Sequence, residues 1–267
     1  MTAPRLVVRL LAACWTLVLG LGVFLVAGAR AANPVTRSDA VVRYANAPGF
    51  AGLPGWNRPL TGGRPAPGVY LYATTGFARI DRLGVRRDYP ATTARIVRLG
   101  PGCQWREQVA IFNEHLETYS ACAQRGDQID TGFGTRLTYF FVPGVTDLVC
   151  EPGGTRTATG RTAGAAVTFR CADEDHDVVA TGTATFRGVS AVTVEGRATP
   201  CRRVTIVTVL SGTTTGAASR ELCTTPDTGL VLSETRTVGV GVRSRFVGRV
   251  AYTEQATFTL QSLTPLT

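Results

Sequence analysis

Beyond Cys14, which lies in the N-terminal apolar segment, the chain has six cysteines, and their spacing constrains the fold more than any other feature. In chain order they form three pairs separated by 19, 21 and 22 residues: Cys103 and Cys122, Cys150 and Cys171, Cys201 and Cys223. An even cysteine count in an exported chain is typical of disulfides, although six cysteines allow fifteen pairings. Two antiparallel strands joined by a tight turn bring such neighbours together. The spacing therefore predicts three β-hairpins, each with its own disulfide.

The hairpin hypothesis fixes the strand register, because opposed residues share a face of the sheet. With Cys103 opposite Cys122, Trp105 lies across from Ser120, and the apolar positions fall together. No CxxC motif is present, and the cysteine spacings differ from those of zinc ligands. The cysteines are therefore expected to be structural.

The second and third pairs also give favourable registers. If the second pair is opposed, the turn is Gly160-Arg161, and glycine at the first position is typical of a type II′ turn. If the third pair is opposed, Arg203 lies across from Glu221, a favourable cross-strand partner.

From Gly68 onward the sequence alternates with a period of two. We expect an all-β domain, a long antiparallel meander of about twelve to fifteen strands. A large sheet without covering helices must bury one face, so the meander is expected to form a curved sheet, half-barrel or barrel. The segments that carry the alternation are VYLYA, FARIDRL, TARIVRL, TRLTYFFV, VTIVTVL, GLVLSET and ATFTLQSL.

Turns and a partial repeat divide this region. Val194-Glu195-Gly196 and Pro226-Asp227-Thr228-Gly229 are typical of hairpin turns. The segment ATTGFARID resembles ATGTATFRG, and each precedes a cysteine hairpin. Whether 68–150 and 178–267 are two similar halves is left open.

The chain begins with an apolar segment after two arginines. Arg5 and Arg9 precede the uncharged run Leu10–Ala29, which as a helix would just span a bilayer. We expect a single-pass anchor in the cell membrane through residues 10–29, with the rest of the chain extracytoplasmic. Cleavage of a signal peptide near Ala29 or Ala31 is the alternative.

These features predict three parts: an anchor or signal helix at 1–30, a Pro/Gly-rich spacer at 31–67 and the stapled β domain at 68–267. No stretch after residue 30 shows a helical stripe over three turns. Four apolar residues of the spacer could dock on the domain: Val41, Val42, Phe50 and Trp56.

Charge and composition exclude some chemistry. All 28 basic residues are arginine, so mechanisms that need lysine, such as Schiff bases, are excluded. The net charge of +9 is scattered along the chain and comes with no nucleic-acid recognition motif, so we expect no nucleic-acid partner. Among specific partners, anionic lipid or wall polymer suits an exported basic surface better. A solvated arginine surface without a specific partner is the preferred interpretation.

The two histidines mark the candidate sites. His115 lies in FNEHLET, and Glu114 or Glu117 could orient it as a general base. We predict instead that His115 is on the solvent side of a hairpin tip.

His176 lies in CADEDHDVV, where Asp173, Asp175 and Asp177 alternate like the start of a calcium loop. The glycine and glutamate that an EF-hand needs are replaced by Val178 and Ala184. These aspartates are weak metal candidates, and a solvated acidic loop is the preferred interpretation.

One stretch of the chain resembles a known group of proteins. PAPGVYLYATTGFARIDRLGVRRDYPATT, continuing to GCQW and YSAC, is similar to an uncharacterised family of exported or membrane-anchored proteins from high-GC bacteria. The similarity covers about residues 66–150 and implies location and architecture, without an activity.

The sequence thus favours a non-enzymatic cell-envelope protein, a binding or structural module without a cofactor. Its partner would be an apolar ligand, such as a lipid held in the curved sheet, or another envelope protein. No G-x-S-x-G, HExxH or P-loop motif is present. The alternative is a secreted hydrolase of wall or lipid substrate, with His115 or His176 beside a carboxylate in a cleft.

Overall fold

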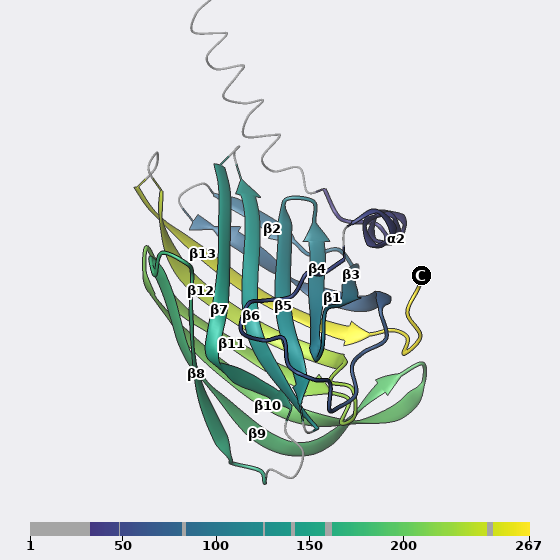
Figure 1. Ribbon diagram of the computed structural model, residues 1–267. Helices are drawn as coiled ribbons and strands as arrows, with labels where there is room; N and C mark the ends of the chain where they lie inside the picture. The colour runs from purple at the N-terminus through teal and green to yellow at the C-terminus, as the bar shows by residue number, and fades with distance from the viewer. Residues whose placement is uncertain are drawn as a thin grey trace, which may run out of the picture.

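The computed structural model describes residues 33–47, 49–81, 84–124, 126–139, 142–157, 162–244 and 248–267. One helix, α2 (Arg37–Asn46), precedes a single antiparallel sheet of 13 strands (Figure 1). The strands are β1 (Gly68–Ile80), β2 (Val85–Asp88), β3 (Thr92–Leu99), β4 (Gln104–Phe112), β5 (His115–Gln124), β6 (Asp127–Tyr139), β7 (Val142–Thr157), β8 (Ala166–Ala172), β9 (Val178–Val194), β10 (Arg197–Gly212), β11 (Thr214–Thr224), β12 (Val231–Ser244) and β13 (Gly248–Leu260). The predicted all-β antiparallel meander is confirmed.

The sheet closes on itself through its first and last strands. From β3 to β13, each strand pairs with the next in the chain. Strand β1 pairs with β13 over Tyr72–Ile80, and its other edge is shared by β3 and β2. Figure 1 shows the strands curving round until β13 lies beside β1. The sheet therefore forms a ring, which encloses the main apolar core.

The ring is weakest between β7 and β8. Only two residue pairs join these strands, Val149 with Ala172 and Cys150 with Cys171, within the part of the chain that the structure describes. The neighbouring pair β8 and β9 shares seven. The Cys150–Cys171 disulfide joins the two strands at this short contact.

The cysteines pair as the spacing predicts, in consecutive order. Cys150 and Cys171 are directly opposed, with Cα atoms 3.9 Å apart. Two of the predicted registers are wrong. The first ladder pairs Gln104 with Cys122, one residue away from the prediction, and Trp105 meets Ala121 instead of Ser120.

In the third hairpin the ladder pairs Arg203 with Cys223, two residues from the predicted register. The bridge from Cys201 therefore runs diagonally, over a Cα separation of 5.4 Å. Arg203 still forms an ion pair with Glu221, as a diagonal neighbour. A disulfide tolerates a range of Cα separations, so cysteine spacing defines the partners but not the exact register.

The predicted turns agree with the structure where they are described. Glu195 and Gly196 have φ of 51° and 74° and join β9 to β10, as a type I′ turn requires. Gly229, with φ of 74°, ends the turn before β12. The predicted Gly160-Arg161 turn lies outside the described residues.

Part of the predicted spacer is folded onto the outside of the ring. Helix α2 begins at a capping box, in which the Thr36 side chain accepts from the Asp39 amide and the Asp39 carboxylate accepts from the Thr36 amide. Figure 1 shows α2 outside the ring, beside β3. The buried Ala40 of this helix belongs to one apolar cluster with Val69 of β1 and Ile96 of β3. The sequence did not predict this helix, which spans ten residues.

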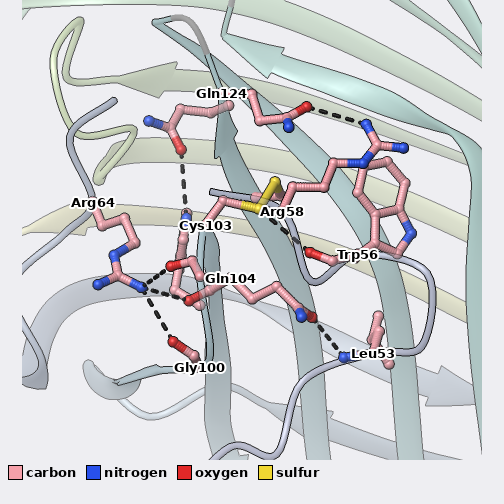
Figure 2. Close-up of a disulfide and its surroundings, with 12 residues drawn as sticks. Leu53, Trp56, Arg58, Arg64, Gly100, Cys103, Gln104 and Gln124 are labelled. Atoms are coloured by element: carbon pink, nitrogen blue, oxygen red, sulfur yellow. Dashed lines mark hydrogen bonds between the residues drawn. A yellow bond between two sulfur atoms is a disulfide. The ribbon is translucent and has the colours of Figure 1, made fainter. Parts of the chain in front are cut away.

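The segment after α2 covers the first disulfide (Figure 2). Phe50 and Trp56 are buried, while Val42 is exposed. Trp56 packs on Cys103 and Cys122, and one nitrogen of Arg64 donates to three carbonyl oxygens around Cys103 at 2.8–3.2 Å. The first strands are therefore buried on both faces.

The predicted anchor at residues 10–29 lies outside the described residues. Among those that are described, no helix has both the length and the apolar character needed to cross a membrane.

Candidate functional site

A cavity of about 230 Å³ lies within the ring of strands. Its walls are mainly apolar, and its polar lining consists largely of charged and aromatic hydroxyl groups. The apolar lining includes Phe133, Leu137, Phe169, Ile206, Leu210, Val238 and Val240. The ionisable lining consists of His115, Glu117, Tyr119, Asp130, Arg220, Arg236, Tyr252 and Glu254. A mostly apolar space with a few convergent polar groups is the usual form of a small-molecule site.

Charged side chains point into the ring where they lie an even number of residues from buried apolar side chains on the same strand. In β4, Trp105, Glu107 and Val109 share the inner face and are all buried. In β12, Glu234 and Arg236 follow the buried Leu232 at intervals of two. Because alternate residues of a strand point to the same face, these ionisable side chains lie in the interior with the apolar ones.

Arg95, which is buried, and Arg220, which is partly buried, meet at Glu234. Arg95, which has no exposed surface, donates to Glu107 at 2.7 Å and to Glu234 at 2.5 Å. Arg220 donates to the other oxygen of Glu234 at 2.7 Å and stacks 3.9 Å from the Tyr119 ring centroid. Burying these charges requires such pairing, because an unpaired buried ion is very costly.

A second group is centred on Arg236. This guanidinium pairs with both Glu117 and Glu254 and lies 4.8 Å from the ring of Phe258. The hydroxyl of Tyr119 donates to Glu117 at 3.0 Å, and that of Tyr252 donates to Glu254 at 2.8 Å. The carboxylate oxygens of both glutamates are therefore engaged.

His115 belongs to this second group, so its predicted position on the solvent side is wrong. Its side chain is fully buried, and Nε2 lies 3.0 Å from Glu117 Oε1. The ladder of β4 and β5 runs one residue away from the predicted register, so Val109 lies opposite Glu117, and His115 shares the inner face with Glu117. A one-residue change of register exchanges the two faces of a strand, which explains the error.

The ion pairs shift the pKa values of the buried carboxyls. Burial alone would raise the pKa of Glu117, but Arg236 and the hydrogen bond from His115 lower it to about 2. For Glu234, burial is likewise outweighed, and Arg220 and Arg95 hold its pKa well below the usual range. Burial raises the pKa of Tyr119. Both carboxylates are thus ionised at neutral pH.

One trio could geometrically hold a metal ion. Ligand atoms of His115, Glu117 and Glu254 lie within 4.8 Å of one another, the one such group among the described residues. Arg236 already supplies the positive charge between the two glutamates. A metal ion would have to displace this guanidinium, so we assign no metal here.

The acidic loop is elsewhere, and its aspartates are not part of that trio. Asp175 and Asp177 are exposed in the turn between β8 and β9, and Asp173 is half-buried. The Asp173 carboxylate accepts from the Val178 amide at 3.1 Å, and His176 has φ of 59°. Asp173 therefore stabilises the turn, and His176 is exposed.

Within the part of the chain that the structure describes, three lining residues carry a buried nitrogen without a hydrogen-bond partner: His115 Nδ1, Arg220 Nη2 and Arg236 Nη2. The guanidinium nitrogens are donors only. The sequence analysis missed both arginines. The sequence signal for such an arginine is a position an even number of residues from apolar residues on the same strand. Arg236, four residues after Leu232, is an example.

Comparisons of the chain with models of known protein families, with curated proteins and with solved structures found no match.

Proposed function

We propose that this protein is a non-enzymatic binding module of the cell envelope that holds a small, largely apolar ligand inside its ring of strands. The observation that carries the proposal is the cavity of about 230 Å³, apolar along its walls and polar at one group of buried side chains. Sites of this kind bind small molecules through apolar contact and orient them with a few polar groups.

An extracytoplasmic location is part of the proposal. Three disulfides are typical of an oxidising compartment outside the cytoplasm. The apolar run at 10–29 would attach the module to the membrane, in keeping with the resemblance of residues 66–150 to exported proteins.

Strand β11 offers a matched pair of variants to test ligand binding. Ala218 lines the cavity, whereas its neighbour Ala217 is exposed on the opposite face. Ala218→Trp should fill much of the cavity, while Ala217→Trp adds the same side chain outside the ring. Small molecules extracted with solvent from each purified protein would be identified by mass spectrometry.

We expect a stoichiometric apolar molecule from the wild type and Ala217→Trp, and its loss from Ala218→Trp. Recovery of no such molecule from the wild type, together with no uptake of added lipids or alcohols, would contradict the proposal.

The hydrolase alternative has one observation in its favour, the contact of His115 with Glu117 in the cavity. A general base must also reach the group that it activates. Nε2 of His115 is engaged by Glu117, and Nδ1 has no hydrogen-bond partner, so no hydroxyl of the described residues forms a hydrogen bond with the imidazole. Hydrolysis of medium-chain p-nitrophenyl esters that is abolished by His115→Gln would favour the hydrolase instead.

A further inference from the structure

The two arginines that line the cavity have spare donors, whereas its two glutamates are engaged as acceptors. Arg220 and Arg236 each retain a buried N–H group without a partner. Leaving a buried donor unsatisfied is unfavourable, and an acceptor oxygen on a ligand would satisfy it. These two guanidinium groups therefore favour a ligand whose polar end accepts hydrogen bonds.

The two glutamates of the same lining, Glu117 and Glu254, already use their carboxylate oxygens as acceptors. Glu117 receives His115, Arg236 and Tyr119, and Glu254 receives Arg236 and Tyr252. An ammonium group can only donate, so it would have to compete with these internal bonds. A cationic polar end is thus disfavoured.

An anionic polar end is disfavoured by the charge balance. Among the described residues that line the cavity, two arginines face three carboxylates: Glu117, Asp130 and Glu254. A carboxylate ligand would add a further negative charge in a partly enclosed, low-dielectric space. The ligand carboxylate would also lose its hydration on binding. The arginines are already paired with glutamates, so they would replace the lost hydrogen bonds only in part.

We propose that the ligand is an uncharged amphiphile with an alcohol, ester or ketone oxygen at its polar end, which is recognised by Arg220 and Arg236. The inference rests on the proposed binding function and specifies its ligand class. The apolar chain lies along the walls formed by residues such as Phe133, Phe169 and Val238. The oxygen then accepts from the unpartnered guanidinium nitrogens.

The test compares three probes of equal chain length on the purified full-length protein: decan-1-ol, decanoate and decylammonium. Isothermal titration calorimetry at neutral pH should show decan-1-ol binding at least tenfold more tightly than either ion. Equal or tighter binding of decanoate or decylammonium would overturn the inference and leave the binding function intact. Binding of none of the three, even by protein extracted with solvent, would contradict the binding function itself.

A pair of variants tests whether Arg220 is responsible for the preference for decan-1-ol. Arg220→Gln should weaken decan-1-ol binding about fivefold, as expected for one net hydrogen bond. Arg203→Gln removes an exposed arginine from a neighbouring strand and should leave binding unchanged. Near-UV circular dichroism checks that both variants are folded. If Arg220→Gln does not fold, the order of the three probes on the wild type still decides the question.

Discussion

The most direct test of the interior ion-pair network is the substitution Glu234→Gln. Glu234 has no exposed surface and accepts from Arg95 at 2.5 Å and from Arg220 at 2.7 Å. The amide keeps the shape of the side chain but removes its charge. Arg220 then loses its charged partner, and Arg95 keeps only Glu107.

The expected cost follows from burial. Removing one partner of a buried ion pair typically costs about 3–5 kcal/mol, because a charge is left uncompensated. For a chain of this size that corresponds to a fall in the melting temperature on the order of 10 °C. Glu221→Gln is the matched control: Glu221 also pairs with an arginine, Arg203, but both side chains are 43% exposed. Such an exposed pair contributes about 0–1 kcal/mol.

The free energy of unfolding of each variant would be measured by urea denaturation followed by far-UV circular dichroism. We expect Glu234→Gln to lower it by several kcal/mol more than Glu221→Gln. If the two variants lose the same amount, or if Glu234→Gln loses less than about 1 kcal/mol, the buried network does not stabilise the ring as argued here.

Three further predictions follow from other parts of the ring. Gly76 has φ of 142°, and a Cβ there would collide with the Gln255 carbonyl of β13, so Gly76→Ala should cost about 2–4 kcal/mol in urea unfolding. Gly239→Ala, with nothing within 4 Å of its Cβ, should cost almost nothing, and equal losses would contradict this account of ring closure. The pKa of Glu117 falls from 4.5 when unfolded to about 2 when folded, so its contribution to stability is complete above pH 4.5 and is lost as the pH falls toward 2. Unfolding titrations across this interval should show the loss, with a smaller slope in Glu117→Gln; a flat profile in the wild type would refute the assignment. Trp56→Ala should expose the Cys103–Cys122 bridge and speed its reduction by dithiothreitol, whereas Leu60→Ala, an already exposed side chain, should not; equal rates would show that Trp56 does not shield it.

The sequence predicted the cysteine partners and the meander because both depend on short-range patterns. Spacing of about twenty residues suits a hairpin, and period-two alternation suits a strand. The register was less accessible, because a disulfide tolerates a shift of one residue and the ladder pairs Gln104 instead of Cys103 with Cys122. The error placed His115 on the wrong face.

The interior charges could not be located by polarity alone. Arg95 and Glu234 lie 139 positions apart and meet only because the ring closes. A charged residue on a strand is usually assigned to solvent, and that rule fails where opposite charges converge in the fold. Helix α2 was missed for a different reason: it is short, and its stability comes from Thr36 and from packing on the outer face of the sheet.

The pairing of β1 with β13 also sets the order of events in folding. Residues near 72 must find partners near 260, so the ring cannot close until the last strand of the chain is available. Until then a growing series of hairpins presents an open edge at β1, and such an edge readily joins strands of other molecules. Production of this protein therefore depends on how well that edge is protected until the ring closes.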